Sequence, residues 1–134
     1  MTLPHLLRYQ VPVFVWMLAI FTLSSIPTIP VIKFPISPDK LGHAGIYFVL
    51  CMLWKRALFR QDRISFFQKH ALALSFFLTA AHGILDEVYQ MSVPGRSAEV
   101  FDALADAAGA GLFILWQWWK MRRGEQKNLG SGSF

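Results

Sequence analysis

The chain has 134 residues, of which 54% are hydrophobic and only 16% are charged, so it can form one domain with far less charge than the roughly 25% of an average soluble domain. Its net charge of +5 is compatible with nucleic-acid binding. The Lys and Arg residues, however, fall mostly in two clusters that directly follow apolar segments, as at the cytoplasmic ends of membrane helices, and this placement argues against a nucleic-acid partner. The single cysteine, Cys51, excludes a disulfide framework and a multi-cysteine zinc site.

The first predicted helix covers about residues 9–26. No charged residue occurs between Arg8 and Lys33, and the apolar stretch is long enough to cross a hydrocarbon core of about 30 Å. A signal peptide is the alternative interpretation, because a basic residue precedes the apolar stretch and the small residues Ser24 and Ser25 follow it. The run is long and lacks a clear cleavage site, so we favour a membrane helix.

The second predicted helix covers about residues 38–54. Ser37 can cap it, Pro38 fits its first turn, and Asp39 complements the positive end of the helix dipole. The segment that follows is the strongest orientation signal in the chain, because its basic residues are opposed only by Asp62: Lys55, Arg56, Arg60, Arg63 and Lys69. The positive-inside rule predicts that this segment is cytoplasmic.

The third predicted helix, about 71–90, starts apolar and ends polar, and Pro94 with Gly95 then forms a turn. The fourth, about 98–119, can be capped by Ser97 and is followed by a second basic run.

Four crossings place Arg8, the basic segment from Lys55 to Lys69 and the basic run from Lys120 on one side of the membrane. The predicted fold is therefore an all-α membrane protein, a four-transmembrane-helix bundle with cytoplasmic N- and C-termini. Residues 1–124 form its single transmembrane domain, and 125–134, which include a Gly/Ser-rich end, form a flexible tail.

Polar residues gather toward the other end of the last three predicted helices, at one common depth. They recur at intervals of four, which stacks them on one face of each helix: Asp39, His43 and Tyr47; His82, Asp86 and Gln90; Asp102 and Asp106. Ionisable side chains at membrane depth are costly unless they face the bundle interior or a wet cavity. Small residues in the fourth helix, Ala105 with Gly109 and Ala103 with Ala107 and Gly111, predict close helix approach.

The ordered set Asp39-Lys40-x-x-His43-x-x-x-Tyr47, Asp86-Glu87-x-x-Gln90 and Pro94-Gly95-Arg96 with Asp102 and Gly109 resembles the VanZ-like family over about residues 10–118. The resemblance implies a small multipass protein of the bacterial cell membrane. The family is named after a protein associated with resistance to the glycopeptide antibiotic teicoplanin. Members commonly have Asn at the position of Asp106, so this chain carries an extra carboxylate there.

The sequence predicts an outward-facing site that binds or modifies an envelope lipid or a glycopeptide-related ligand. Candidate acid, base or polar-network residues are His43, His82, Asp86, Glu87 and Asp102. Candidate ligand-binding residues are Asp39, Lys40, Tyr47, Gln90, Arg96 and Asp106. The partner expected is a membrane lipid or an envelope precursor, and whether the protein is an enzyme or an oligomer stays open.

Other interpretations compete with this one. The carboxylates and histidines are numerous enough for a divalent metal, but no HExxH-type signature is present, so no metal and no cofactor is predicted. Arg96 can instead pair with Glu87, Glu99 or Asp102, and the polar residues can merely hold the bundle of an accessory protein. A small transporter would need a polar path, yet the inner halves of the helices carry little besides Ser75, Thr79 and Gln117.

Overall fold

The computed structural model describes residues 3–27, 38–96 and 99–130, and within these ranges the chain is helical without a strand. The helices in chain order are α1 (Leu3–Tyr9), α2 (Val11–Ser24), α3 (Pro38–Arg60), α4 (Ser65–Lys69), α5 (Ala71–Gln90) and α6 (Val100–Gly130). The all-helical class predicted from the sequence is confirmed. The predicted caps Ser37 and Ser97 lie outside the described residues.

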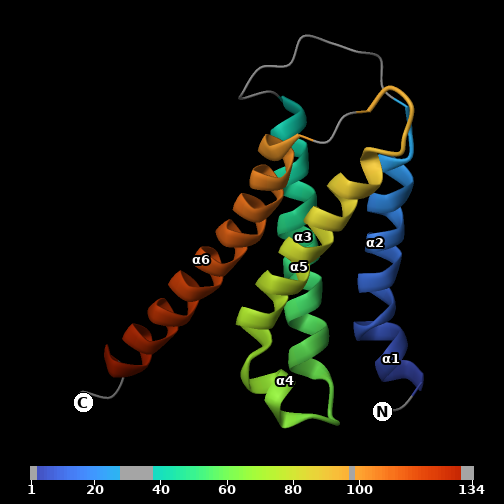
Figure 1. Ribbon diagram of the computed structural model, residues 1–134. Coiled ribbons are helices and arrows are strands. Elements are labelled where there is room, and N and C mark those ends of the chain that lie inside the picture. Colours follow the sequence, from blue (N-terminus) through green and yellow to red (C-terminus); the bar gives the residue numbers. More distant parts are fainter. Residues whose placement is uncertain (1–2, 28–37, 97–98, 131–134) are drawn as a thin grey trace.

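Successive long helices run in opposite directions, so α1 and the C-terminal part of α6 lie at the same end of the molecule (Figure 1). At this basic end, Arg8, Lys55 and Arg60 line a cavity of about 410 Å³ together with Trp116 of α6. The opposite end carries His43, Asp86, Glu87, Asp102 and Asp106 and is called the polar end below. The two charge patterns seen in the sequence therefore belong to opposite ends of one bundle.

The helix limits differ from those expected at several points. Residues 3–24 form two helices, because Pro12 lacks the N–H that would continue α1 into α2. Helix α3 continues to Arg60 instead of stopping near Trp54, and α6 continues to Gly130. Lys, Arg, Gln and Glu are good helix formers, so a change from apolar to basic residues marks the edge of an apolar layer and does not end a helix.

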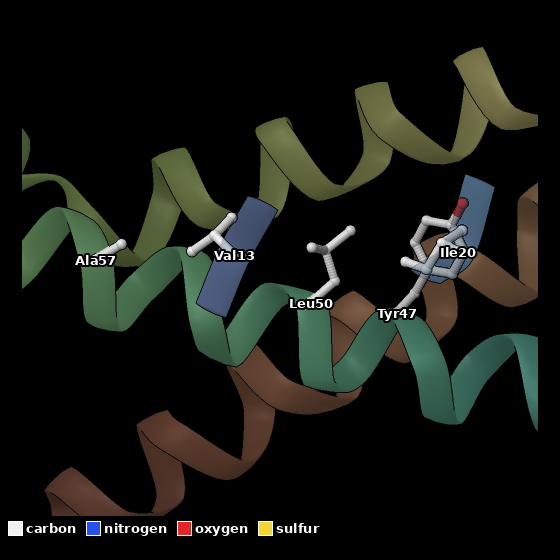
Figure 2. Close-up of a cluster of buried hydrophobic side chains, with 5 residues drawn as sticks. All are labelled: Val13, Ile20, Tyr47, Leu50 and Ala57. Atoms are coloured by element: carbon white, nitrogen blue, oxygen red, sulfur yellow. The ribbon is translucent and has the colours of Figure 1, made fainter. Parts of the chain in front are cut away.

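Helix α3 is the centre of the packing and contacts α2, α5 and α6. Figure 2 shows Val13 and Ile20 of α2 against Tyr47, Leu50 and Ala57 of α3, which together form one buried cluster. A second cluster joins α3 to α6 through Cys51, Ala110 and Phe113. These contacts fix the rotation of α3 and hence which of its side chains point inward.

The distribution of polarity is the reverse of that in a soluble protein. The buried residues of α5 are small or polar: Ala71, Ser75, Thr79, Gly83, Asp86, Glu87 and Gln90. Large apolar side chains of the same helix, such as Phe77, Ile84 and Leu85, are more than half exposed. Exposing these side chains to water would forgo their burial energy, whereas lipid accommodates them, so the surface fits a membrane protein.

Three described segments are long and apolar enough to cross a membrane, namely Leu3–Ser24, Ala71–Gln90 and Val100–Gly124. Helix α3 is not among them, since charged residues at 40 and 55 bound its uncharged stretch. A central helix exposes less surface to lipid and can therefore be less apolar. A fourth crossing by α3 stays a prediction.

Helices α3 and α6 approach each other closely at Gly109. A Cβ placed there would lie 2.8 Å from the Cα of Ala44 and still closer to its carbonyl oxygen. The predicted close approach is thus confirmed at this position. At Gly111, the second glycine among the small residues noted in the sequence, an added Cβ would face open space.

Candidate functional site

Lys40 joins α3 to the start of α6 at the polar end. Its Nζ lies 3.0 Å from Oε2 of Glu99 and 2.7 Å from Oδ1 of Asp102. The side chains of Lys40 and Asp102 are only 11% and 7% exposed, so this ion pair is weakly screened by solvent. The charge of Lys40 is therefore already matched within the bundle.

One helical turn further into the bundle, His43 and Asp106 link the same two helices. Nδ1 of His43 lies 3.0 Å from Oδ1 of Asp106, whose side chain is only 1% exposed. Glu87 of α5 lies beside them, and its Oε2 accepts a 2.9 Å hydrogen bond from the backbone N–H of Glu99. One potential ligand atom each from His43, Glu87 and Asp106 lie within 4.8 Å of one another. Titratable groups from three helices thus meet in one layer.

A second chain of hydrogen bonds joins α2 to α5. Oδ2 of Asp86 accepts hydrogen bonds from Oγ of Ser24 at 2.7 Å and from Nε2 of Gln90 at 3.1 Å. Oε1 of Gln90 in turn accepts a 3.0 Å hydrogen bond from Nη1 of Arg96. Asp86 and Gln90 are both buried, so the network lies inside the bundle and fixes the rotation of α5 against α2.

Arg96 also closes the C-terminal end of α2. Its Nε and Nη2 donate to the carbonyl oxygens of Ile26 and Leu23 at 3.0 and 3.2 Å, and the Leu23 oxygen also accepts from the backbone N–H of Ile26. Among the described residues, Arg96 is not hydrogen-bonded to any of the carboxylates considered from the sequence, which were Glu87, Glu99 and Asp102. All three oxygens that it contacts are neutral.

A cavity of about 320 Å³ lies next to this network. Its lining combines apolar and polar side chains from three helices and the loop before α6: Ile20, Leu23, Ser24, Gly42, His43, Ile46, Tyr47, Asp86 and Arg96. Ligand pockets begin at about 300 Å³, so the space suits a headgroup and excludes a complete lipid. The structure therefore offers a small amphipathic recess at the polar end.

The structure brings most of the predicted site residues into this layer: Lys40, His43, Tyr47, Asp86, Glu87, Gln90, Arg96, Asp102 and Asp106. His82 lies a turn deeper, with its ring centroid 6.1 Å from that of Tyr47 and its Nε2 buried without a hydrogen-bond partner among the described residues. Asp39 belongs to the first turn of α3, but its side chain is outside the described part of the chain.

Sequence reasoning missed two participants, Ser24 and Glu99. Ser24 had been considered only as a small residue near the end of an apolar helix. A signal was present, because a serine inside an apolar membrane segment tends to hydrogen-bond across helices. Glu99 was noted among the polar residues but not assigned to the site, although its carboxylate contacts Lys40 and its N–H orients Glu87.

Replacing Ser24 with alanine is expected to lower the free energy of unfolding by about 1–2 kcal/mol, because a buried carboxylate loses one of its donors. Unfolding of the detergent-solubilised protein by SDS measures this. Ser92→Ala is the matched control, since the Ser92 hydroxyl donates to Tyr89 at an exposed site. Equal stability of the two variants would show that the Ser24–Asp86 contact contributes nothing.

Comparison with known proteins identifies the family. The family model described as VanZ/LLP1 matches residues 8–120, a range that contains α2 to α5, most of α6 and every hydrogen bond of the polar end given above. Among curated proteins and among solved structures, comparison finds no match to the chain. The match covers most of the 134 residues. The chain therefore belongs to the VanZ/LLP1 family.

Proposed function

We propose that this chain is a four-span protein of the bacterial cytoplasmic membrane whose polar end faces outward and binds an envelope lipid by its phosphate-bearing headgroup. Both termini are then cytoplasmic. A glycopeptide-related ligand, which carries its own apolar and polar parts, is the second candidate occupant of the same recess. The family's name connects it with glycopeptide resistance, and binding of this kind is one way in which such a protein would act on the envelope.

The observation that carries the proposal is the amphipathic cavity at the polar end. Arg96 lines it, and its hydrogen bonds within the described part of the chain go to neutral oxygens. A guanidinium that is hydrogen-bonded to neutral oxygens keeps its positive charge available to a phosphate. Ser24 and His43 add polar groups that can contact a headgroup, whereas Ile20 and Ile46 suit the first part of an acyl chain.

The orientation is supported by the other end of the bundle. Arg8, Lys55 and Arg60 gather there, and basic residues flanking membrane helices are typical of the cytoplasmic side. The polar end is then the extracytoplasmic one. A transport function is less well supported, because the buried residues between the two ends are mainly apolar, as in the Leu50 and Cys51 clusters of α3.

Gly42→Leu is expected to displace the lipid. Gly42 lines the cavity, and a Cβ there meets no atom within 4 Å, so there is room to attach a larger side chain that takes up space in the recess. We expect the lipid retained by native mass spectrometry to fall about tenfold, which corresponds to about 1.4 kcal/mol of lost affinity. The probe is the protein exchanged into vesicles of phosphatidylglycerol, phosphatidylethanolamine and diacylglycerol.

Gly45→Leu is the matched control, because Gly45 belongs to the same helix, has the same open surroundings and does not line the cavity. It should retain the two phospholipids like the original chain, and diacylglycerol, which lacks the phosphate, should be retained poorly by both. Equal retention by the two leucine variants, or no preference for phosphate, would contradict the proposal. Displacement of phospholipid by added teicoplanin would identify the glycopeptide as a competing occupant.

A further inference from the structure

Two buried carboxylates at the polar end each have an oxygen without a hydrogen-bond partner among the described residues. These oxygens are Oε1 of Glu87 and Oδ2 of Asp106, and the two residues are only 6% and 1% exposed. An unsatisfied buried polar atom is costly, and the cost is larger when the group is charged. Within the described part of the chain, therefore, no donor group contacts either of these two oxygens.

No described side chain supplies the missing charge in full. Lys40 is hydrogen-bonded to Glu99 and Asp102, and Arg96 donates to neutral oxygens on the α2 side of the bundle. The basic residues Lys55 and Arg60 lie at the opposite end. His43 is the one ionisable donor recorded next to Asp106, and even when protonated it would balance only one of the two carboxylates.

We propose that His43, Glu87 and Asp106 bind a first-row divalent metal ion such as Zn²⁺. One imidazole nitrogen with two carboxylate oxygens is a donor set that suits such ions, whereas Ca²⁺ and Mg²⁺ prefer oxygen ligands alone. The two positive charges of the ion match the two carboxylates. Three protein ligands leave a further coordination position for water or for a ligand oxygen.

The geometry needs little adjustment to form this site. The potential ligand atoms lie within 4.8 Å of one another, and the donors of a tetrahedral zinc site are about 3.4 Å apart, so movements of about 1 Å are sufficient. The backbone N–H of Glu99 donates a hydrogen bond to one oxygen of Glu87 and so orients its carboxylate. Metal-bound side chains are commonly oriented by hydrogen bonds of this kind. Each ligand comes from a different helix, so the ion would tie α3, α5 and α6 together.

Gly83 preserves the space that the site requires. A Cβ at this position would lie 3.0 Å from Oδ2 of Asp106 and 3.3 Å from the ring of Tyr47. The hydroxyl of Tyr47 is itself buried without a hydrogen-bond partner among the described residues. The absence of a side chain at Gly83 therefore leaves Asp106 free to adjust toward a ligand.

The test is a titration of the detergent-purified, chelator-treated protein with Co²⁺, followed by its visible absorption, and with Zn²⁺ by calorimetry. We expect one ion per chain and a Co²⁺ spectrum of low coordination number. Glu87→Gln and Asp106→Asn should weaken binding by more than about tenfold, because each exchanges an anionic carboxylate ligand for a neutral amide. Asp62→Asn is the matched control for loss of a carboxylate and should bind like the original chain, since Asp62 is exposed between α3 and α4 at the basic end of the bundle.

Thermal unfolding separates a metal site from an ordinary hydrogen-bond network. Asp106→Asn should leave the metal-free protein at least as stable, because it removes a buried charge, and should abolish the rise in melting temperature that Zn²⁺ gives the original chain. Two results would overturn the proposal. One is a spectrum of aquated Co²⁺ with the original chain, and the other is equal metal binding by Asp106→Asn and Asp62→Asn.

Discussion

Gly109→Ala is expected to destabilise the folded protein by about 2–3 kcal/mol. The added methyl group would lie 2.8 Å from the Cα of Ala44 and closer to its carbonyl oxygen, and backbone atoms cannot rotate aside as a side chain can. Helix α6 must therefore move away from α3, which weakens the contacts of Phe113 and Ala110 with Cys51. Overpacking of this kind commonly costs 1–3 kcal/mol, and the upper part of that range applies to backbone contacts.

The matched control is Gly111→Ala in the same helix, where an added Cβ meets no atom within 4 Å. This exchange should be neutral or stabilising by up to about 1 kcal/mol, because alanine is the better helix former. SDS-induced unfolding of both variants, followed by circular dichroism, measures the difference. If Gly109→Ala and Gly111→Ala had the same stability, the close crossing of α3 and α6 at Ala44 would not exist.

Lys40→Met is expected to cost about 3–5 kcal/mol, because it removes the cation from a poorly solvated ion pair with Asp102 and Glu99. Nζ of Lys40 contacts both Glu99 and Asp102, and the three side chains are at most 20% exposed. Repulsion between the two carboxylates adds to the lost attraction. The start of α6 should separate from α3, and the free energy of unfolding in detergent measures the loss.

Neutralising the carboxylates should restore most of the stability. The triple variant Lys40→Met, Glu99→Gln, Asp102→Asn carries no unpaired charge, and replacing a complete buried ion pair by neutral groups is often nearly neutral in energy. Lys69→Met, in an exposed position of α4, is the control for loss of a lysine and should change little. A triple variant as unstable as the single one would show that charge pairing is not what Lys40 contributes.

Helix α5 shows why a polar layer can be recognised from sequence. His82, Asp86 and Gln90 recur at intervals of four, and a membrane helix must turn such residues inward, so the face they share follows from the sequence alone. Asp86 and Gln90 are indeed buried and hydrogen-bonded to each other. Glu87, one residue on, points to α6 instead and contacts Glu99 across the helix pair.

The hydrogen-bond partners of Lys40 and Arg96 could not be predicted in the same way. Lys40 and Arg96 are both cations near the carboxylates of α6, and the sequence does not state which one reaches them. Tyr47 and Leu50 fix the rotation of α3, and this rotation brings Lys40 to Asp102. Arg96 instead donates to a carbonyl oxygen at the C-terminal end of α2. Such choices depend on several helices at once, and no local spacing encodes them.

Packing between several helices also explains why the sequence did not identify His43, Glu87 and Asp106 as one set of metal ligands. A metal motif within one helix, such as HExxH, is visible because two ligands lie one turn apart in a single segment. Here His43, Glu87 and Asp106 belong to three helices, and only their packing brings the ligand atoms together. A sequence without a local signature is therefore weak evidence against a metal in a helical bundle.

The proposed envelope-lipid site requires the polar end to face away from the cytoplasm, and labelling of single cysteines tests this orientation directly. In a Cys51→Ala background, a membrane-impermeant maleimide is added to spheroplasts carrying either Ser92→Cys or Arg63→Cys, both at exposed positions. We expect Ser92→Cys to be labelled at once and Arg63→Cys only after the membrane is permeabilised. Labelling of Arg63→Cys in intact spheroplasts, with Ser92→Cys protected, would place the recess in the cytoplasm and contradict the proposed envelope ligand.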